Sequence, residues 1–406
     1  MQRKDEIMRR SKRRFLFLNV GHFLDHLFVL VFATAALRLT TEWGMSYAEL
    51  IPYATPGFVA FGICAIPAGW LADKWSREGM MVVFFIGIGS CTILAGATST
   101  PLEMAVCLTL IGMFAAIYHP VGLAMVVHGL DKTGMPLAIN GVYGNMGVAS
   151  AALLTGFLVD ASGWRSAFIL PGILSIIVGV LYFFFVRAEH DADHKGVATD
   201  TKTQQPEILP KQTLFRIFGI ILFTTAVGGL IFQSTTFALP KVFEERLTDI
   251  AGTATLVGFY AFLVFAVAAF AQLVVGYLVD NHSVRTVLAT VALLQCVFFF
   301  TMTQLQGVAA LLVAIAFMLV VFGQIPINDV LVGRIARSEW RSRAYALRYV
   351  VTFSVMASAL PLIAWIHADR GFSMLFGVLA VAAFAIFLAA LLLPAAEKVL
   401  HAKSTT

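Results

Sequence analysis

The chain has 406 residues, of which 59% are hydrophobic and 13% are charged, with a formal net charge of +5. Soluble proteins carry roughly 25% charged residues, so this composition excludes an ordinary soluble enzyme, a disordered chain and a nucleic-acid binder. Because almost none of the chain is solvated, the positive charge does not indicate an acidic partner, and we expect a protein that crosses a membrane many times.

Twelve segments of the chain are apolar and long enough to cross a membrane as helices, which takes about 20 residues each. No segment alternates polar and apolar residues at period two, as transmembrane β-strands do. We therefore predict an all-α membrane protein. The predicted spans cover residues 15–39, 47–72, 79–98, 101–128, 136–160, 165–187, 213–240, 253–279, 285–304, 307–332, 343–367 and 371–394.

The Lys and Arg residues lie mostly in alternate loops. If the N-terminus is cytoplasmic, 23 of the 28 basic residues fall on the cytoplasmic side of the membrane. Cytoplasmic loops of membrane proteins carry an excess of Lys and Arg. The distribution therefore predicts that both termini are cytoplasmic.

Spans 1 and 4 contain ionisable residues at membrane depth. His22, Asp25 and His26 are three and four residues apart, so they share one face of a helix. Counted along their helices, His22 and His119 both lie ~6 Å to the cytoplasmic side of the membrane centre. Because charged groups are costly inside a bilayer, we interpret these four residues as functional candidates.

The sequence contains an internal repeat. The segment 69–77, after span 2, matches the segment 276–285, after span 8, and the first glycines of the two segments are 207 residues apart. A second pair, 163–168 and 371–376, has an offset of 208 residues. Each half of the chain is therefore expected to contain six spans in the same orientation, as in transporters built from parallel repeats.

The repeat predicts the domain boundaries. An N-terminal six-helix bundle is expected at residues 1–187 and a C-terminal six-helix bundle at 213–406. Between them, residues 188–212 are polar and contain proline, so we interpret this segment as a cytoplasmic linker.

Uncharged polar residues lie in spans of both halves. Gln324 and Asn328 flank Pro326, which occupies a place in span 10 that matches Pro120 in span 4. A proline frees a backbone carbonyl and lets a helix bend, so helices 4 and 10 are predicted to be moving gates. Polar groups at these depths bind substrate or hydrogen-bond between helices. The predicted substrate-binding residues are Tyr143, Asn145, Gln233, Gln324 and Asn328.

The loop after span 2 reads Gly-Trp-Leu-Ala-Asp-Lys-Trp-Ser-Arg over residues 69–77. It resembles the loop signature of the major facilitator superfamily, and residues 276–285 resemble a degenerate copy of it. Within this superfamily, residues 22–25 and 118–120 resemble the fosmidomycin-resistance group of bacterial exporters. The resemblance covers the whole chain and implies twelve helices in two parallel-repeat bundles, in the inner membrane of a bacterium.

In the resembled fold, spans 1 and 4 are adjacent and line a central cavity. A desolvated carboxylate beside histidines can gain and lose protons near neutral pH, as a proton carrier must. We therefore predict that Asp25, His22, His26 and His119 couple proton movement to transport. One alternative is that these residues form a hydrogen-bonded structural cluster. Another is a transition-metal site, which we do not predict because no Met or Cys ligand accompanies these residues.

The resemblance also implies a gating latch at the cytoplasmic loops. In the family, the loop aspartate faces a helix N-terminus of the other half, and the arginine pairs with a nearby acid. A carboxylate gains stabilisation at a helix N-terminus because of the helix dipole. The predicted latch residues are Asp73 and Arg77, their counterparts Asp280 and Arg285, and Asp329 and Arg348.

We therefore predict a secondary active transporter, an antiporter that exports a small organic compound with proton coupling by alternating access. The sequence contains no P-loop, so transport is expected to run on a gradient. Import of a nutrient, cofactor or metal chelate in the same fold is one alternative, and a non-transporting membrane sensor or assembly factor is another. We expect no enzymatic activity, no cofactor and no nucleic-acid partner. The expected partners of the monomer are a small-molecule substrate, protons and the lipid bilayer.

Overall fold

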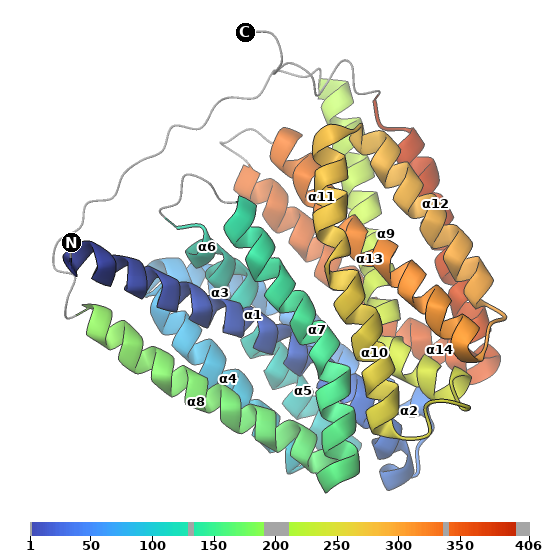
Figure 1. The fold of residues 1–406 in the computed structure, drawn as a ribbon, viewed down its shortest axis with the longest axis horizontal. Coiled ribbons are helices and arrows are strands. Elements are labelled where there is room, and N and C mark those ends of the chain that lie inside the picture. The colour runs from blue at the N-terminus through green and yellow to red at the C-terminus, as the bar shows by residue number, and fades with distance from the viewer. Residues whose placement is uncertain (1, 129–133, 191–210, 336–340, 395–406) are drawn as a thin grey trace. The chain divides into compact units, whose positions relative to one another are not determined.

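The computed structural model describes residues 2–128, 134–190, 211–335 and 341–394, and within these ranges it contains helices and no strands (Figure 1). The helices of the first half are α1 (Gln2–Trp43), α2 (Tyr47–Leu50), the 3₁₀ turn η1 (Ile51–Ala54), α3 (Thr55–Lys74), α4 (Arg77–Gly96), α5 (Pro101–Ala115), the π-helical turn η2 (Tyr118–Gly122), α6 (Leu123–Val126), α7 (Gly134–Ser162) and α8 (Trp164–His190). The helices of the second half are α9 (Lys211–Arg246), α10 (Ala254–Ala269), α11 (Ala271–Asn281), α12 (Val284–Met302), α13 (Gly307–Ile335) and α14 (Arg341–Leu391).

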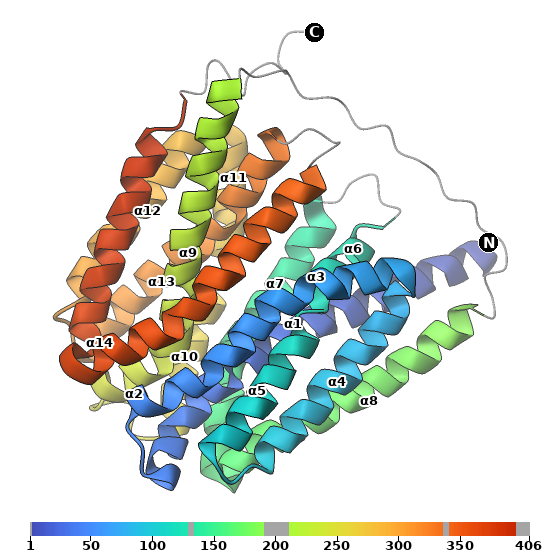
Figure 2. The ribbon, with the colours of Figure 1, turned by 180° about the vertical axis from the view of Figure 1, so that it is seen from behind.

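Eleven helical segments of the described residues are long and apolar enough to cross a membrane. The last of them, Val350–Leu391, has 42 residues, about twice the length that one crossing needs. Gly371 divides it, because its φ of 64° and ψ of −170° lie outside the helical region. Figure 2 shows the two arms of α14 on either side of this turn. The prediction of an all-α protein with twelve spans is therefore confirmed.

The turn at Gly371 has a counterpart in the first half. Gly163, between α7 and α8, has a φ of 83°, in the same left-handed region that favours glycine. Five residues after each glycine, Phe168 and Phe376 are buried, with exposed fractions of 0% and 2%. The repeated sequence therefore places a glycine of positive φ and a buried phenylalanine at the same spacing in both halves.

Residues at the starts of several helices in the first half satisfy the free backbone N–H groups there. The Ser46 hydroxyl accepts a hydrogen bond from the Glu49 N–H, and the Glu49 carboxylate accepts one from the Ser46 N–H. Thr100 and Glu103 form the same reciprocal capping box, with Pro101 in the first turn. Such caps fix where a helix begins.

The fourth span is interrupted at its proline. α5 ends at Ala115, and Pro120 lies in the π-helical turn η2 before the short helix α6. Proline lacks a backbone N–H and cannot close an i→i−4 hydrogen bond, and π-turns often occur at functional sites. Pro326 lies inside the continuous helix α13. The two matching prolines therefore have different local structures, and only the first is accompanied by a π-turn.

The chain divides into two compact units. One contains residues 1–201 and 253–262, and the other contains residues 202–252 and 263–406. The first turns of α10 belong to the first unit because the Thr255 N–H and hydroxyl both donate to the Asp160 carboxylate at the end of α7, at 2.7 and 2.5 Å. Most of the predicted linker, residues 191–210, lies outside the described residues.

Candidate functional site

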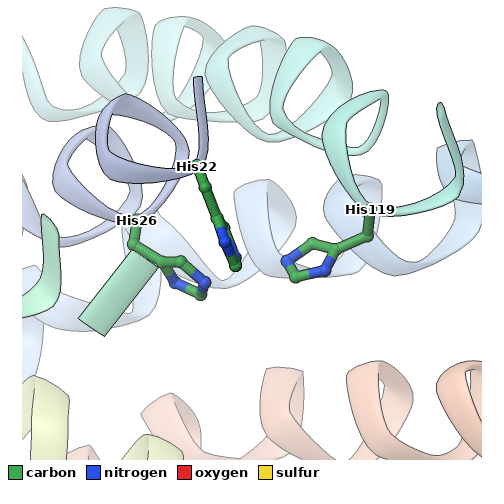
Figure 3. A group of neighbouring side chains, drawn as sticks. All are labelled: His22, His26 and His119. Atoms are coloured by element: carbon green, nitrogen blue, oxygen red, sulfur yellow. The ribbon is translucent and has the colours of Figure 1, made fainter. Parts of the chain in front are cut away.

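Three histidines of the first unit meet in one cluster, as Figure 3 shows. His22 and His26 come from α1, and His119 comes from the π-turn η2. The ring centroids are 4.9 Å apart for His22 and His26, 5.4 Å for His22 and His119, and 5.6 Å for His26 and His119. The helical spacing of four residues thus places His22 beside His26, and the packing of η2 against α1 adds His119.

Asp25 completes the predicted cluster. Its side chain has an exposed fraction of 0%, and its Oδ2 lies 3.4 Å from Nε2 of His119. Neither carboxylate oxygen has a hydrogen bond of good geometry among the described residues. A buried carboxylate without such partners is costly as an anion, so a proton or a protonated imidazole is needed to neutralise it. The four predicted proton-coupling residues are therefore neighbours.

One hydrogen bond fixes the His22 ring. Its Nδ1 lies 2.8 Å from the Asn140 carbonyl oxygen, which can only accept, so Nδ1 carries the hydrogen. The ring also stacks on Tyr118, with centroids 4.7 Å apart and planes 18° from parallel. The other nitrogen, Nε2, is buried and has no hydrogen-bond partner among the described residues. His22 therefore keeps one ring nitrogen that can accept a proton or bind a ligand.

A second layer of polar side chains supports this arrangement. The Tyr118 hydroxyl donates to the Leu18 carbonyl oxygen at 2.8 Å. The Asn140 amide donates to the Tyr118 hydroxyl at 2.9 Å and to Asn19 Oδ1 at 2.8 Å. Asn19 was not among the residues predicted for this site. Its signal is its position three residues before His22, which places it on the same face of α1.

In the second unit, Gln324 and Asn328 belong to a hydrogen-bonded network. Gln295 of α12 donates from Nε2 to Gln324 Oε1 at 2.8 Å. The Thr224 hydroxyl of α9 donates to Asn328 Oδ1 at 3.0 Å. Gln324 and Asn328 were predicted as substrate ligands, and their partners Gln295 and Thr224 were not among the predicted residues. These bonds favour the alternative, hydrogen bonding between helices.

The other predicted substrate-binding residues have different surroundings. Gln233 has an exposed fraction of 2% and Asn145 one of 7%, and the amide nitrogens of both are buried without a hydrogen-bond partner among the described residues. Tyr143 is 37% exposed. Two buried amide groups, one in each unit, thus retain donor capacity that a bound molecule can use.

Four of the predicted latch residues lie at helix ends, namely Asp73, Arg77, Asp280 and Arg285. Arg77 donates to Asp73 at 2.9 Å, so the acid that pairs with this arginine is the aspartate four residues before it. Asp280 lies in the last turn of α11, and Arg285 lies in the first turn of α12. Arg348 is buried in α14, with an exposed fraction of 7%. The Asp329 side chain lies outside the described part of the chain.

One buried cation lies outside the predicted site. Arg246, at the end of α9, has an exposed fraction of 5%. Its guanidinium donates to the Met302 carbonyl oxygen and lies 5.3 Å from the centroid of the Phe376 ring. Arg246 therefore satisfies the carbonyl end of α12, which explains its burial.

A bundle of apolar helices with an internal repeat and a buried cluster of ionisable groups defines a class of protein, the polytopic membrane transporters. The chain matches the sequence profile of the Major Facilitator Superfamily over residues 18–248 and 221–406. It belongs to that family. The members of the family are transporters of small molecules and not enzymes, and this chain is a multi-pass membrane protein.

Several curated relatives are similar to parts of the chain. A gallate transporter of Pseudomonas putida is 22% identical over 64% of this chain and 64% of its own length. A probable hexose phosphate transport protein of Chlamydia pneumoniae is 24% identical over 48% of this chain and 47% of its own length. A 4-hydroxybenzoate transporter of Pseudomonas aeruginosa is 28% identical over 40% of this chain and 37% of its own length. The chain thus spans less than two thirds of each relative.

A solved structure matches nearly the whole chain. It is a bacterial homologue of the human lysosomal transporter Spinster, in an inward-facing and unoccupied conformation. The TM-score is 0.72, the sequence identity is 14%, and the match covers 95% of both chains. At this identity the likeness shows the fold alone.

Proposed function

We propose that this transporter is a proton-coupled antiporter of the bacterial inner membrane that exports a small organic compound by alternating access. The observation that carries the proposal is Asp25, a fully buried carboxylate in a membrane-spanning helix, 3.4 Å from His119. Moving a charge across a membrane potential changes its free energy by about 2.3 kcal/mol per 100 mV. A proton that binds this pair from one side and leaves to the other therefore couples the gradient to transport.

Within this proposal, His22 and His26 extend the proton site. Their rings lie within 5.6 Å, centroid to centroid, of the His119 ring or of each other. We place both termini in the cytoplasm, because most Lys and Arg residues then lie on the cytoplasmic side. We further propose that the transporter works as a monomer.

Substrate contacts are assigned to uncharged polar residues. Gln233 and Asn145 have buried amide nitrogens without hydrogen-bond partners among the described residues, and a ligand that accepts those hydrogen bonds gains affinity. Tyr143, Gln324 and Asn328 are the further candidates. The latch residues predicted from the loops are proposed to open and close the pathway, together with the fourth span (α5, η2 and α6) and the tenth span (α13).

Import is the second candidate direction. Two relatives of this chain are named as transporters of gallate and of 4-hydroxybenzoate; these names indicate small aromatic acids as compounds to test and state no direction of transport. The same fold and the same proton site serve both directions. Export by antiport requires that substrate and proton bind in alternation, and import by symport requires that they bind together.

Transport in proteoliposomes tests the proposal. Purified protein is reconstituted into vesicles with an imposed pH gradient, and the movement of labelled gallate, 4-hydroxybenzoate and uncharged aromatic compounds is followed. We expect at least one compound to move against its concentration gradient, and we expect a protonophore to abolish this accumulation. If the transport rate depends neither on the pH gradient nor on the protonophore, that result would contradict proton coupling. The sign of the effective gradient separates export from import.

A further inference from the structure

We propose that His22, His26 and His119 form a binding site for a divalent transition-metal ion of the Zn²⁺ class. One ring nitrogen from each histidine lies within 4.8 Å of the other two. Figure 3 shows the three rings turned toward a shared space. Imidazole is a preferred ligand of zinc, nickel, cobalt and copper ions, and three histidines suffice as the protein ligands of a zinc ion.

The distances fit such an ion after small side-chain movements. A zinc ion binds imidazole nitrogen at about 2.1 Å, so two nitrogens on one ion are at most about 4.2 Å apart. The three nitrogens of this cluster are within 4.8 Å of one another. Rotations that move each nitrogen by on the order of 1 Å or less therefore bring them to bonding distance.

The surroundings of His22 are those of a metal ligand. Metal-binding histidines commonly donate their second ring N–H to a backbone carbonyl, which fixes the ring and directs the free lone pair at the metal. His22 makes this bond from Nδ1 to the Asn140 carbonyl oxygen at 2.8 Å. Its Nε2 is buried without a hydrogen-bond partner among the described residues. The orienting bond and the free nitrogen are thus already in place.

Asp25 supplies the negative charge that a divalent cation needs at membrane depth. Its Oδ2 is 3.4 Å from Nε2 of His119, and its exposed fraction is 0%. A carboxylate beside a ligating histidine raises the affinity for the metal. Three protein nitrogens leave a position of the metal open, which water or a donor atom of a substrate fills.

Metal binding to the purified full-length protein tests the site directly. The protein carries an affinity tag without histidine, and equilibrium binding of Zn²⁺ alone is measured for the wild type and for His22→Gln, His26→Gln and His119→Gln. His282→Gln is the matched control, because His282 is an exposed histidine in the turn after α11. We expect one ion per wild-type chain, more than about tenfold weaker binding in each cluster variant, and unchanged binding in the control.

A second measurement does not depend on the variants folding normally. X-ray absorption of the zinc-loaded wild type is expected to show nitrogen ligands at about 2.0–2.1 Å. A folded wild type that binds no Zn²⁺, a spectrum without histidine ligands, or cluster variants that bind as tightly as the wild type would each overturn the site. Proton-driven transport is measured separately with metal removed by a chelator, so the failure of either proposal leaves the other standing.

Discussion

The Asp25 carboxylate of α1 and the His119 imidazole of the π-turn η2 lie 3.4 Å apart, from Oδ2 to Nε2, in the interior of one six-helix half. Their exposed fractions are 0% and 16%. The π-turn matters here because it carries both His119 and Pro120, so a change in this turn moves the imidazole relative to the carboxylate. The pair therefore joins a protonatable group to a segment of the fourth span that can bend.

Tyr118 is expected to hold this arrangement together. Tyr118→Phe removes a hydroxyl that donates to the Leu18 carbonyl oxygen and accepts from the Asn140 amide. The loss of these bonds is expected to lower the stability by about 1 kcal/mol, measured as a lower midpoint of thermal unfolding in detergent. Tyr277→Phe is the control, since Tyr277 is 66% exposed. Equal midpoints for the two variants would contradict a structural role of the network.

The contact between α1 and α7 leaves no room for a side chain at Gly147. A Cβ atom at this position would overlap the backbone of Phe23. Gly147→Ala is therefore expected to push the helices apart and to lower the stability by about 1–3 kcal/mol, again measured by thermal unfolding. At Gly377, a helical glycine with open space around it, the same substitution is expected to leave the midpoint unchanged or raise it. A tolerated alanine at position 147 would rule out the close approach.

Two glutamines of the second unit are expected to respond in opposite ways. Gln324→Leu breaks the bond from Gln295 and is expected to lower the unfolding midpoint. Gln233→Leu removes a buried amide nitrogen without a partner among the described residues, so the midpoint is expected to hold while KM for substrate rises about two- to tenfold. If Gln233→Leu lowers stability and leaves KM unchanged, then Gln233 does not contact substrate.

Much of the fold could be predicted from the sequence because its strongest signals are local. Runs of about 20 apolar residues define the spans, and the repeat at Gly163 and Gly371 placed two matching turns. The π-turn could not be placed, because Pro120 and Pro326 look alike in the sequence and only the first lies in such a turn. Tertiary packing decides between these outcomes.

The candidate site, like the fold, was predictable only where its signals are local in the sequence. Helical spacing alone put His22, Asp25 and His26 on one face of α1. The partner of His22 is a backbone carbonyl, that of Asn140, and every residue has a carbonyl, so no residue type marks this bond. The burial of Arg246 against the end of α12 also depends on contacts far along the chain. Interactions between distant segments are therefore what the sequence could not predict.

We propose that Asp25 carries the coupling proton, and proton movement across the membrane of proteoliposomes is the most direct test of this role. A pH-sensitive dye inside the vesicles reports the protons that move when a transported compound is added, for the wild type, Asp25→Asn and the matched control Asp249→Asn, whose aspartate is exposed. We predict a substrate-dependent pH change for the wild type and the control, and none for Asp25→Asn, although that variant still exchanges labelled for unlabelled substrate. A pH change in Asp25→Asn equal to that of the wild type would contradict this role of Asp25.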